Sequence, residues 1–147
     1  LMSRGLGDVY KRQDLCYELD SNTISLWSKK QWIDEFKKEG VNVFGLLLSN
    51  LVIGICVFQI VLDEAQINFF VVNQKYRKKG YGTYLMNHII KQCEILNISK
   101  LLLEVSLTNT TAEKFYNNFD FYTVGIRTNY YKDGSDALLK EKNLTTK

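Results

Sequence analysis

The sequence predicts a single α+β domain, α/β in the broader sense, in which a mixed, mostly antiparallel sheet is flanked by helices. Two observations support this class: β-rich runs broken by turn residues alternate with segments whose apolar residues recur at helical spacing, and no linker or repeat divides the chain. The 147 residues are 46% hydrophobic and 24% charged, a composition typical of folded proteins, and the length suffices to bury one core. We therefore expect one domain over residues 14–147.

Residues 1–13, LMSRGLGDVYKRQ, are expected to be a non-native leader, because they resemble the translated sequencing-adapter sequence found at the ends of some assembled genes. Without this segment, 16 cations face 15 anions and the net charge falls from +3 to +1. The charge then gives little support to a general affinity for nucleic acid. A native first strand of the sheet would be missing or replaced.

The first half of the chain predicts two helices and three strands. Apolar spacing favours helices over residues 14–22 and 29–39, the second with Ser28 as its N-cap and Gly40 beyond its end. β-rich runs then extend over residues 42–72 and are broken twice by polar turn residues. These runs predict three antiparallel strands joined by two hairpin connections.

The second half predicts two further helices and three further strands. One helix starts at the glycines in positions 80 and 82 and continues to about residue 96, with a buried stripe of Leu85, Ile89, Cys93 and Leu96. A strand at 100–106 precedes a second, short helix that is opened by a capping box at residues 110–113. Two last strands surround residues 132–135, Lys-Asp-Gly-Ser, a sequence typical of a hairpin.

The stretch RKKGYGTYL, residues 77–85, combines three cations with two closely spaced glycines at the start of a predicted helix. Gly80 and Gly82 allow the backbone to approach a ligand closely, and the N–H groups at a helix N-terminus attract anions. The P-loop pattern GxxxxGKS/T is absent, and Leu85 occupies the third glycine position of GxGxxG. From the residues alone, an anion site and an ordinary turn with solvated lysines are equally good interpretations.

Together with the preceding strand, which ends in FFVV, this segment resembles motif A of the GNAT acetyltransferases, Arg/Gln-x-x-Gly-x-Gly/Ala, at Arg77, Gly80 and Gly82. The resemblance implies the GNAT acyl-CoA N-acyltransferase fold, acetyl-coenzyme A (acetyl-CoA) as cosubstrate, and direct transfer of the acetyl group. It also implies cofactor contacts, with the backbone N–H of Val72 as oxyanion donor. The implied cofactor-binding residues are Phe70, Val71, Val72, Arg77, Lys78, Lys79, Gly80, Tyr81, Gly82, Thr83, Asn109 and Tyr116.

Within this family the sequence most resembles the RimI group, which acetylates the N-terminal alanine of a small-subunit ribosomal protein. The features of that group recur in order as Trp27-Ser28, LDEA at 62–65, LEV at 103–105 and RTNYY at 127–131. One departure is Asp120, which stands where the family has glycine; aspartate tolerates the left-handed conformation better than most residues. The resemblance implies a protein N-terminal peptide as partner, from a ribosomal protein in the simplest case.

Two residues are candidates for the chemistry. Glu104 lies inside the apolar strand LLLEVS, where an unpaired buried charge is costly, so a solvent-facing or ion-paired glutamate is the simpler interpretation from the residues alone. The resemblance implies instead that Glu104 is the general base, and a carboxylate acting through an ordered water is adequate for an α-amine with a pKa near ~8. Tyr116 is a core aromatic by its helical spacing, whereas the resemblance implies the acid that protonates the departing thiolate.

Three aromatic residues are candidates for acceptor binding. Tyr130 and Tyr131 either wall the acceptor slot or alternate on the edge of a sheet, and Trp27 either lines the same slot or packs in the core. No metal is expected, because the three cysteines lack CxxC spacing and the single histidine does not complete a zinc set with them. The cysteines are expected to be reduced core residues.

Three other functions stay open from the sequence. The first keeps the chemistry but takes a lysine side chain, a polyamine or a small amine as acceptor. The others are a catalytically weak acyl-CoA-binding module and a nucleic-acid binder, which would need the cations at 77–79 to belong to a wider basic face. The chain has no apolar run long enough for a bilayer and its first twenty residues lack a signal peptide's apolar centre, so we expect a cytoplasmic monomer without membrane or direct nucleic-acid contacts.

Overall fold

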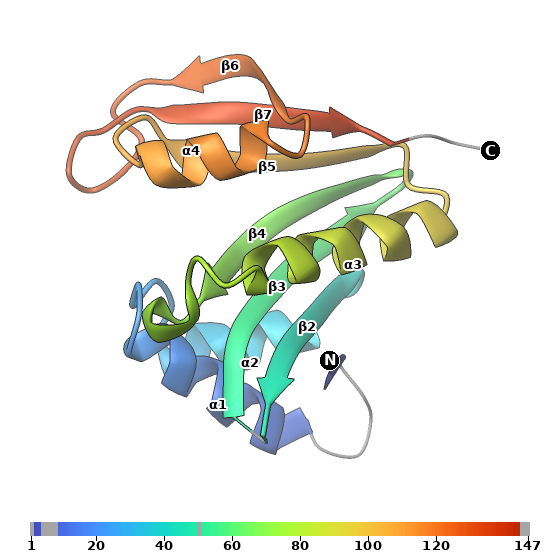
Figure 1. The fold of residues 1–147 in the computed structure, drawn as a ribbon, viewed down its shortest axis with the longest axis vertical. Coiled ribbons are helices and arrows are strands. Elements are labelled where there is room, and N and C mark those ends of the chain that lie inside the picture. Colours follow the sequence, from blue (N-terminus) through green and yellow to red (C-terminus); the bar gives the residue numbers. More distant parts are fainter. Residues whose placement is uncertain (1, 4–8, 50, 145–147) are drawn as a thin grey trace.

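The computed structural model describes residues 2–3, 9–49 and 51–144, which form one sheet with helices on both faces (Figure 1). Within these residues the strand order is β1-β2-β3-β4-β5-β7-β6, and all neighbouring strands are antiparallel except β4 and β5. The strands are β1 (Met2–Ser3), β2 (Val41–Leu48), β3 (Leu51–Val61), β4 (Glu64–Val72), β5 (Lys100–Ser106), β6 (Tyr122–Arg127) and β7 (Ala137–Asn143). The helices are α1 (Val9–Ser21), α2 (Lys29–Lys37), α3 (Tyr81–Ile95) and α4 (Thr110–Asn117), with a 3₁₀ turn at Gln74–Tyr76.

This architecture confirms the predicted fold class, and the differences from the predicted elements lie at boundaries. Helix α1 begins at Val9, within the segment expected to be a leader, and the edge strand β1 pairs with β2. The last hairpin has a wider connection than the predicted turn, because residues 128–136 separate β6 from β7. Whether residues 1–13 are native stays a prediction.

Two apolar clusters form the core, one on each face of the sheet. The first lies beneath α3 and α4 and contains Leu85, Ile89 and Cys93 of the predicted helix stripe. Leu96, predicted in the same stripe, is half exposed because α3 ends at Ile95. The second cluster lies beneath α1 and α2; its members include Cys16, Trp32, Phe36, Val57 and Phe69.

Helix α2 begins at its predicted cap. Ser28 Oγ accepts from the Gln31 N–H at 3.2 Å, and the Gln31 side chain accepts from the Ser28 N–H at 2.7 Å, which completes a capping box. Gly40 has the left-handed φ of +74° but lies beyond the C-cap, Lys38. A glycine is required at position 40 because the backbone of β3 lies close to it: a Cβ there would lie 2.5 Å from the carbonyl oxygen of Ile60.

A β-bulge at Asn68 reverses the faces of the sheet to which the side chains of β4 point. The register against β3 slips by one residue between Ile67 and Phe69, so Asn68 is extra. Ile67 therefore joins the cluster beneath α3 and Phe69 the cluster beneath α1 and α2, although a spacing of two normally keeps residues on one face. The parallel pairing of β4 with β5 also ends here, at Ile67 opposite Leu103.

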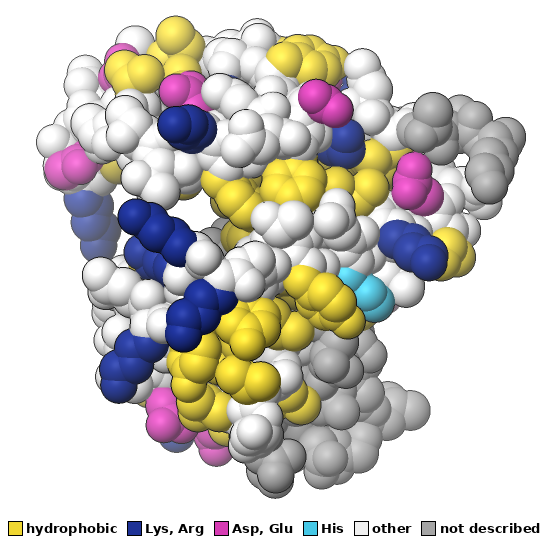
Figure 2. All heavy atoms as spheres, in the orientation of Figure 1, with side chains coloured by type: hydrophobic (Ala, Val, Ile, Leu, Met, Phe, Trp, Pro, Cys, Tyr) yellow, Lys and Arg dark blue, Asp and Glu magenta, His cyan; other side chains and the backbone are white. Residues whose placement is uncertain are grey.

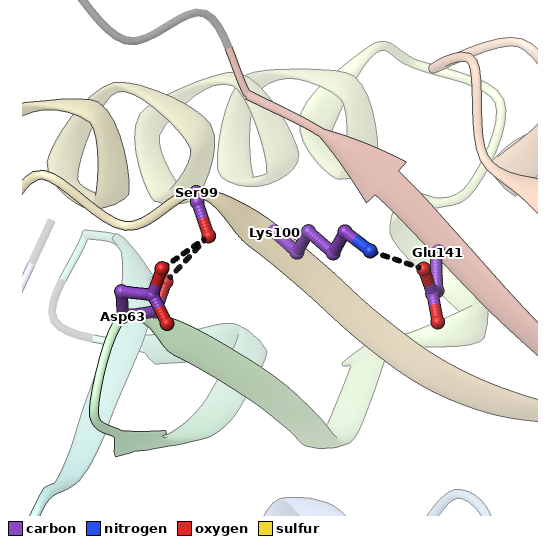
Figure 3. Close-up of polar contacts among 4 residues, drawn as sticks. All are labelled: Asp63, Ser99, Lys100 and Glu141. Atoms are coloured by element: carbon purple, nitrogen blue, oxygen red, sulfur yellow. Dashed lines mark hydrogen bonds and ion pairs between the residues drawn. The ribbon is translucent and has the colours of Figure 1, made fainter.

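Beyond this point β4 and β5 diverge, so the sheet is split from one end (Figure 1). The closed end is tied by polar contacts at the start of β5 (Figure 3). Ser99 Oγ donates to a carboxylate oxygen and to the backbone carbonyl of Asp63 at 2.9 and 3.1 Å, and Lys100 pairs with Glu141 of β7 at 3.3 Å. The Ser99–Asp63 contacts hold the start of β4 and the start of β5 together at this end, and the Lys100–Glu141 pair joins β5 to β7.

A buried lysine of β7 ties α4 to the sheet. Lys140 Nζ donates to Asn117 Oδ1 at 2.9 Å and to Thr123 Oγ1 at 3.0 Å, and lies 3.5 Å from a carboxylate oxygen of Glu113. Lys140→Met keeps the aliphatic bulk but leaves these polar groups without their cation. We expect the free energy of unfolding to fall by about 1–3 kcal/mol, measured by urea denaturation. Lys91→Met, at an exposed position on α3, is the control, and an equal effect of both substitutions would contradict this role.

Candidate active site

A cleft of about 760 Å³ opens where β4 and β5 diverge. The end of β4, the loop before α3, the start of α3, the end of β5 and α4 all contribute to its walls. Figure 2 shows this side of the molecule hollowed between an upper and a lower part, with lysine and arginine side chains gathered beside the hollow. The divergence of the two strands thus leaves a cleft within the range of volumes typical of small-molecule and cofactor sites.

Most of the predicted cofactor residues line this cleft, and two do not. Lys79 and Tyr81 are absent from its lining. The ring of Tyr81 packs edge-on against the ring of Tyr76 at 6.2 Å between centroids, and Lys79 Nζ lies 6.0 Å from the same Tyr76 ring. Both side chains thus lie against Tyr76, and cofactor binding by Lys79 and Tyr81 stays a prediction.

The end of β4 presents backbone groups to the cleft. Asn73 N–H donates to the Ile53 carbonyl at 2.6 Å, and hydrogen-bonded pairs alternate along an antiparallel ladder. The N–H and C=O groups of Phe70 and Val72 therefore face away from β3, toward the space that β5 has left. The Val72 carbonyl accepts from Arg77 Nε at 3.1 Å, which anchors the cationic loop to the strand end.

The glycine loop ends in a helix N-terminus with free N–H groups. Gly80 is the N-cap of α3, with φ +85° and ψ 0°, and Lys78 before it is also left-handed at φ +62°. The first hydrogen bond of the helix runs from the Tyr84 N–H to the Gly80 carbonyl at 2.9 Å, so the N–H groups before Tyr84 lack an intrahelical partner. No atom lies within 4 Å of a Cβ built on Gly80. An anion can therefore approach these N–H groups closely.

Gly82 lies where α3 meets α4. A Cβ on this residue would lie 3.4 Å from Phe115 Cε1 of α4 and 3.7 Å from a methyl carbon of Val72. Both Gly82 and Phe115 line the cleft. A methyl group would fit at ordinary contact distance, but a larger side chain would have to displace the phenyl ring or enter the cleft.

Glu104 lies on β5, one residue beyond the last pairing with β4. Its side chain is 23% exposed and lines both the cleft and a second cavity of about 880 Å³. Arg127 Nη2 lies 3.8 Å from its carboxylate, which also accepts a hydrogen bond from the Tyr130 hydroxyl. The carboxylate is thus ion-paired, as the simpler interpretation held, and it also stands where the two cavities meet.

Tyr130 and Tyr131 lie in the β6–β7 loop and wall the second cavity, and Tyr131 also lines the cleft. The Ser135 carbonyl accepts both of their N–H groups, at 3.1 and 3.2 Å, which holds the two rings side by side. The hydrogen bond to Glu104 and then its charge raise the pKa of Tyr130, while burial and then the charge of Glu104 raise the pKa of Tyr131. Both phenols therefore stay protonated at neutral pH.

Tyr116 is both a core residue and a cleft residue. Its ring packs against Phe70 at 6.3 Å and Phe121 at 5.8 Å between centroids, and it also lines the cleft. Burial, above all, raises the pKa of Tyr116 well beyond its usual value. The phenol can consequently donate a proton or a hydrogen bond, and does not act as a base.

The start and end of α4 differ from the prediction in one respect and agree with it in another. The N-cap is Asn109, whose side-chain oxygen accepts from the Ala112 N–H at 3.1 Å, so the helix is not opened by the predicted capping box at 110–113. Asn109 lines the cleft, together with Thr111 and Ala112, which were not predicted. Asp120 has φ +66°, the left-handed conformation that the family's glycine would adopt.

Trp27 does not line either cavity. Its indole packs against Trp32 at 4.7 Å and Phe69 at 5.2 Å between centroids, so core packing is the correct one of the two interpretations. Ile24 and Leu26, from the same loop, line both cavities instead and were not predicted. Two apolar residues within the polar turn sequence SNTISL were the signal that pointed to them.

In the part of the chain that the structure describes, no three His, Cys, Asp or Glu side chains come together as a metal site. Within the same residues, every helix is too short or too polar to cross a bilayer.

Comparison with known proteins places this geometry in a family. A model of the acetyltransferase (GNAT) family matches residues 6–121. The ribosomal protein bS18-alanine N-acetyltransferase of Escherichia coli is 32% identical over 116 residues, which cover 77% of this chain and 78% of that protein. The protein of the same name from Haemophilus ducreyi is 37% identical over 111 residues, 74% of this chain and 76% of its own length.

Solved structures have the same architecture. The crystal structure of the Escherichia coli ribosomal-protein alanine N-acetyltransferase aligns with a TM-score of 0.88 at 26% identity, covering 99% of this chain and 95% of that one. A GNAT acetyltransferase from Elizabethkingia anophelis, solved with acetyl-CoA bound, has a TM-score of 0.78 at 19% identity and covers 97% and 96%. The resemblance seen in motif A is thus confirmed over most of the sequence, and the chain belongs to the GNAT family as an acetyl-CoA-dependent N-acetyltransferase.

Proposed function

We propose that this acetyltransferase modifies the N-terminal α-amine of a protein, and that the protein is ribosomal, bS18 in the simplest case. The names and coverage of the Escherichia coli and Haemophilus ducreyi relatives support this acceptor. The observation that carries the proposal is the position of Glu104, a half-buried carboxylate at the junction of the cleft and the second cavity. A peptide end entering the second cavity would meet this carboxylate next to the bound cofactor.

The residues of the cleft fit acetyl-CoA. Acetyl-CoA supplies an acetyl group that its thioester activates toward amines. The open space at Gly80, the free N–H groups of Gly82 and Thr83, and the cation of Lys78 suit a diphosphate. The outward N–H and C=O groups of Phe70 suit an amide of an extended pantetheine arm, which would bind as a further strand does, and the Val72 N–H stays free for the thioester oxygen.

Glu104 acts as the general base in this proposal. An α-amine with a pKa near ~8 is neutral about one tenth of the time at pH 7, which costs about 1.4 kcal/mol. A lysine near ~10.4 is neutral only about once in several thousand, which costs about 4.6 kcal/mol. Glu104 also interacts with Arg127 and Tyr130, which weakens it as a base. The smaller cost of deprotonating the α-amine therefore makes that amine the better acceptor for this site.

Val72 and Tyr116 are proposed to act on the thioester of acetyl-CoA. The Val72 N–H faces the cleft and is the donor proposed for the oxygen that gains charge during transfer. Tyr116 is held protonated by burial and is proposed to donate to the sulfur that leaves. In water such a proton transfer, from about 10 to about 8.5 on the pKa scale, is uphill by about 2 kcal/mol. Burial raises the pKa of the phenol and would raise that of the departing thiol in the same site, and a short hydrogen bond between the two offsets the remaining difference.

The cysteines support direct transfer without an acyl-enzyme. Burial raises the pKa of Cys93 to about 12 and that of Cys56 well above its usual value, so neither thiol ionises near neutral pH. Neither residue lines the cleft. We propose further that the enzyme acts in the cytoplasm as a monomer and without a metal, and that the cations beside the cleft serve the cofactor and not a nucleic acid.

A panel of acceptors tests the proposed function. The purified chain is incubated with acetyl-CoA and one of three amines: a peptide beginning with alanine, the same peptide blocked at its N-terminus and carrying one lysine, and spermidine. We expect mass spectrometry to find acetylation of the free α-amine at a kcat/KM at least about tenfold above either alternative. Faster acetylation of the lysine peptide or of spermidine would contradict the α-amine assignment. Thermal stabilisation by acetyl-CoA without turnover on any amine would leave only a binding module.

A further inference from the structure

The carboxylate of Asp20, at the end of α1, is fully buried and bound by donors from three residues. Its two oxygens accept the N–H groups of Leu26 at 2.7 Å and Trp27 at 2.9 Å, and the indole N–H of Trp32 at 2.8 Å. A buried carboxylate is costly unless its lone pairs are used, and here they bind the loop that joins α1 to α2. Neither Glu104 nor the glycine loop is among these partners.

Residue 20 also organises the first part of the same loop through its backbone. The Asp20 carbonyl accepts the N–H groups of Thr23 at 3.1 Å and Ser25 at 2.7 Å, and Thr23 Oγ1 donates to the Leu19 carbonyl at 2.6 Å. Ser25 is held at φ +49°, a left-handed conformation that a residue with a Cβ adopts only where its surroundings impose it. The loop is thus closed around Asp20 against the local preference of the chain.

The loop presents two apolar side chains to the substrate cavities. Ile24 and Leu26 are 48% and 52% exposed, and both line the cleft and the second cavity, which Glu104 and Tyr131 line as well. Trp27, held by the same carboxylate, is packed in the aromatic cluster with Trp32 and Phe69. The Asp20 carboxylate therefore holds both the packed residue Trp27 and the exposed residue Leu26 of this loop in place.

We propose that Asp20 is a positioning residue for the acceptor, because it holds Ile24 and Leu26 as the wall that directs the peptide end toward Glu104. The inference rests on the proposed function, in which the second cavity receives that peptide. Ile24 and Leu26 reach the acceptor side, because both line the second cavity together with Glu104. Among the described residues, the cationic loop and the start of α3 make no hydrogen bond to Asp20.

Steady-state kinetics with the alanine-starting peptide test the role of Asp20. Asp20→Asn keeps the size of the side chain but turns an amide NH₂ toward N–H donors, so the loop loses part of its attachment. We expect KM for the peptide to rise by about tenfold, with kcat lowered less than threefold and the Kd for acetyl-CoA, from calorimetry, within about twofold of wild type. A general loss of folding would lower kcat and cofactor affinity as well.

A second variant covers the case in which Asp20→Asn does not fold. The double variant Ile24→Ser with Leu26→Ser changes only exposed side chains, and we expect the same rise in KM. Asn22→Ala, an exposed position of the same loop outside both cavity linings, is the control and should keep the wild-type KM. An unchanged KM in the double variant, or in folded Asp20→Asn, would overturn the proposal. Failure of the proposed function is separate, because wild type itself would then not acetylate the peptide.

Discussion

Glu104→Gln is expected to lower kcat/KM for an alanine-starting peptide by about 10²- to 10⁴-fold at pH 7. Glutamine has the size of glutamate and still accepts a hydrogen bond from Tyr130, so the wall of the second cavity keeps its shape. It does not take up a proton, and the cationic α-amine then has no acceptor at the junction of the cavities. Initial rates measured by the release of free thiol would report the loss.

The pH dependence of this variant separates a base from a structural residue. The neutral fraction of an α-amine with a pKa near ~8 rises from about one tenth at pH 7 to about nine tenths at pH 9. The rate of Glu104→Gln should therefore rise by about tenfold over this range, because solution now supplies the neutral amine that the carboxylate no longer produces. A defect that stays constant from pH 7 to pH 9 would argue against the assigned role.

Two controls accompany this variant. Glu39→Gln removes a carboxylate from an exposed position outside both cavity linings and should leave the rates unchanged. The Kd of Glu104→Gln for acetyl-CoA should also match that of wild type, since the anion site lies on α3. Wild-type turnover by Glu104→Gln at pH 7 would rule out general-base catalysis by this residue.

Gly82→Val is expected to raise the Kd for acetyl-CoA by about 10²-fold, equivalent to about 2.7 kcal/mol. The first carbon of the new side chain would already lie 3.4 Å from Phe115 Cε1, so the two additional methyl groups must displace the ring or occupy the cleft. Either outcome covers N–H groups at the start of α3 and narrows the path along β4. Isothermal titration calorimetry measures the affinity, and circular dichroism verifies the fold.

Gly80→Ala is the matched control for Gly82→Val. A Cβ at Gly80 meets no atom within 4 Å, but the φ of +85° is unfavourable for alanine. We expect a loss of stability of about 1 kcal/mol, with a smaller loss of cofactor affinity than in Gly82→Val. Equal affinities of the two variants, or a Kd of Gly82→Val within threefold of wild type, would contradict the cleft as the cofactor site.

Features that depend on neighbours in the chain were predictable. The start of α3 at the glycines, the N-cap at Ser28 and the left-handed Asp120 each follow from a few consecutive residues. The N-cap of α4 was misplaced by one position, since Asn109 and Thr110 are both good capping residues and only the observed bond to the Ala112 N–H distinguishes them.

Features that depend on contacts between distant segments were not predictable from the sequence. Trp27 is drawn into the core by Phe69 of β4 and by the carboxylate of Asp20, and this leaves Ile24 and Leu26 at the cavities. Lys79 and Tyr81 similarly lie against Tyr76 and are absent from the cleft lining. Spacing along the chain does not reveal such competition between neighbouring side chains for one packing site.

The sequence by itself determined the family, the order of helices and strands from α1 onward, and the glycine loop proposed as the anion site, because motif A and hydrophobic periodicity are local properties of the chain. Only the tertiary structure decided where the acceptor side lies. The one-residue bulge at Asn68 and the end of β4–β5 pairing at Ile67 open the sheet, and the cavity walls then come from α1–α2, β5 and the β6–β7 loop. Their meeting at Glu104 results from long-range packing, in which each segment buries its apolar face against the others.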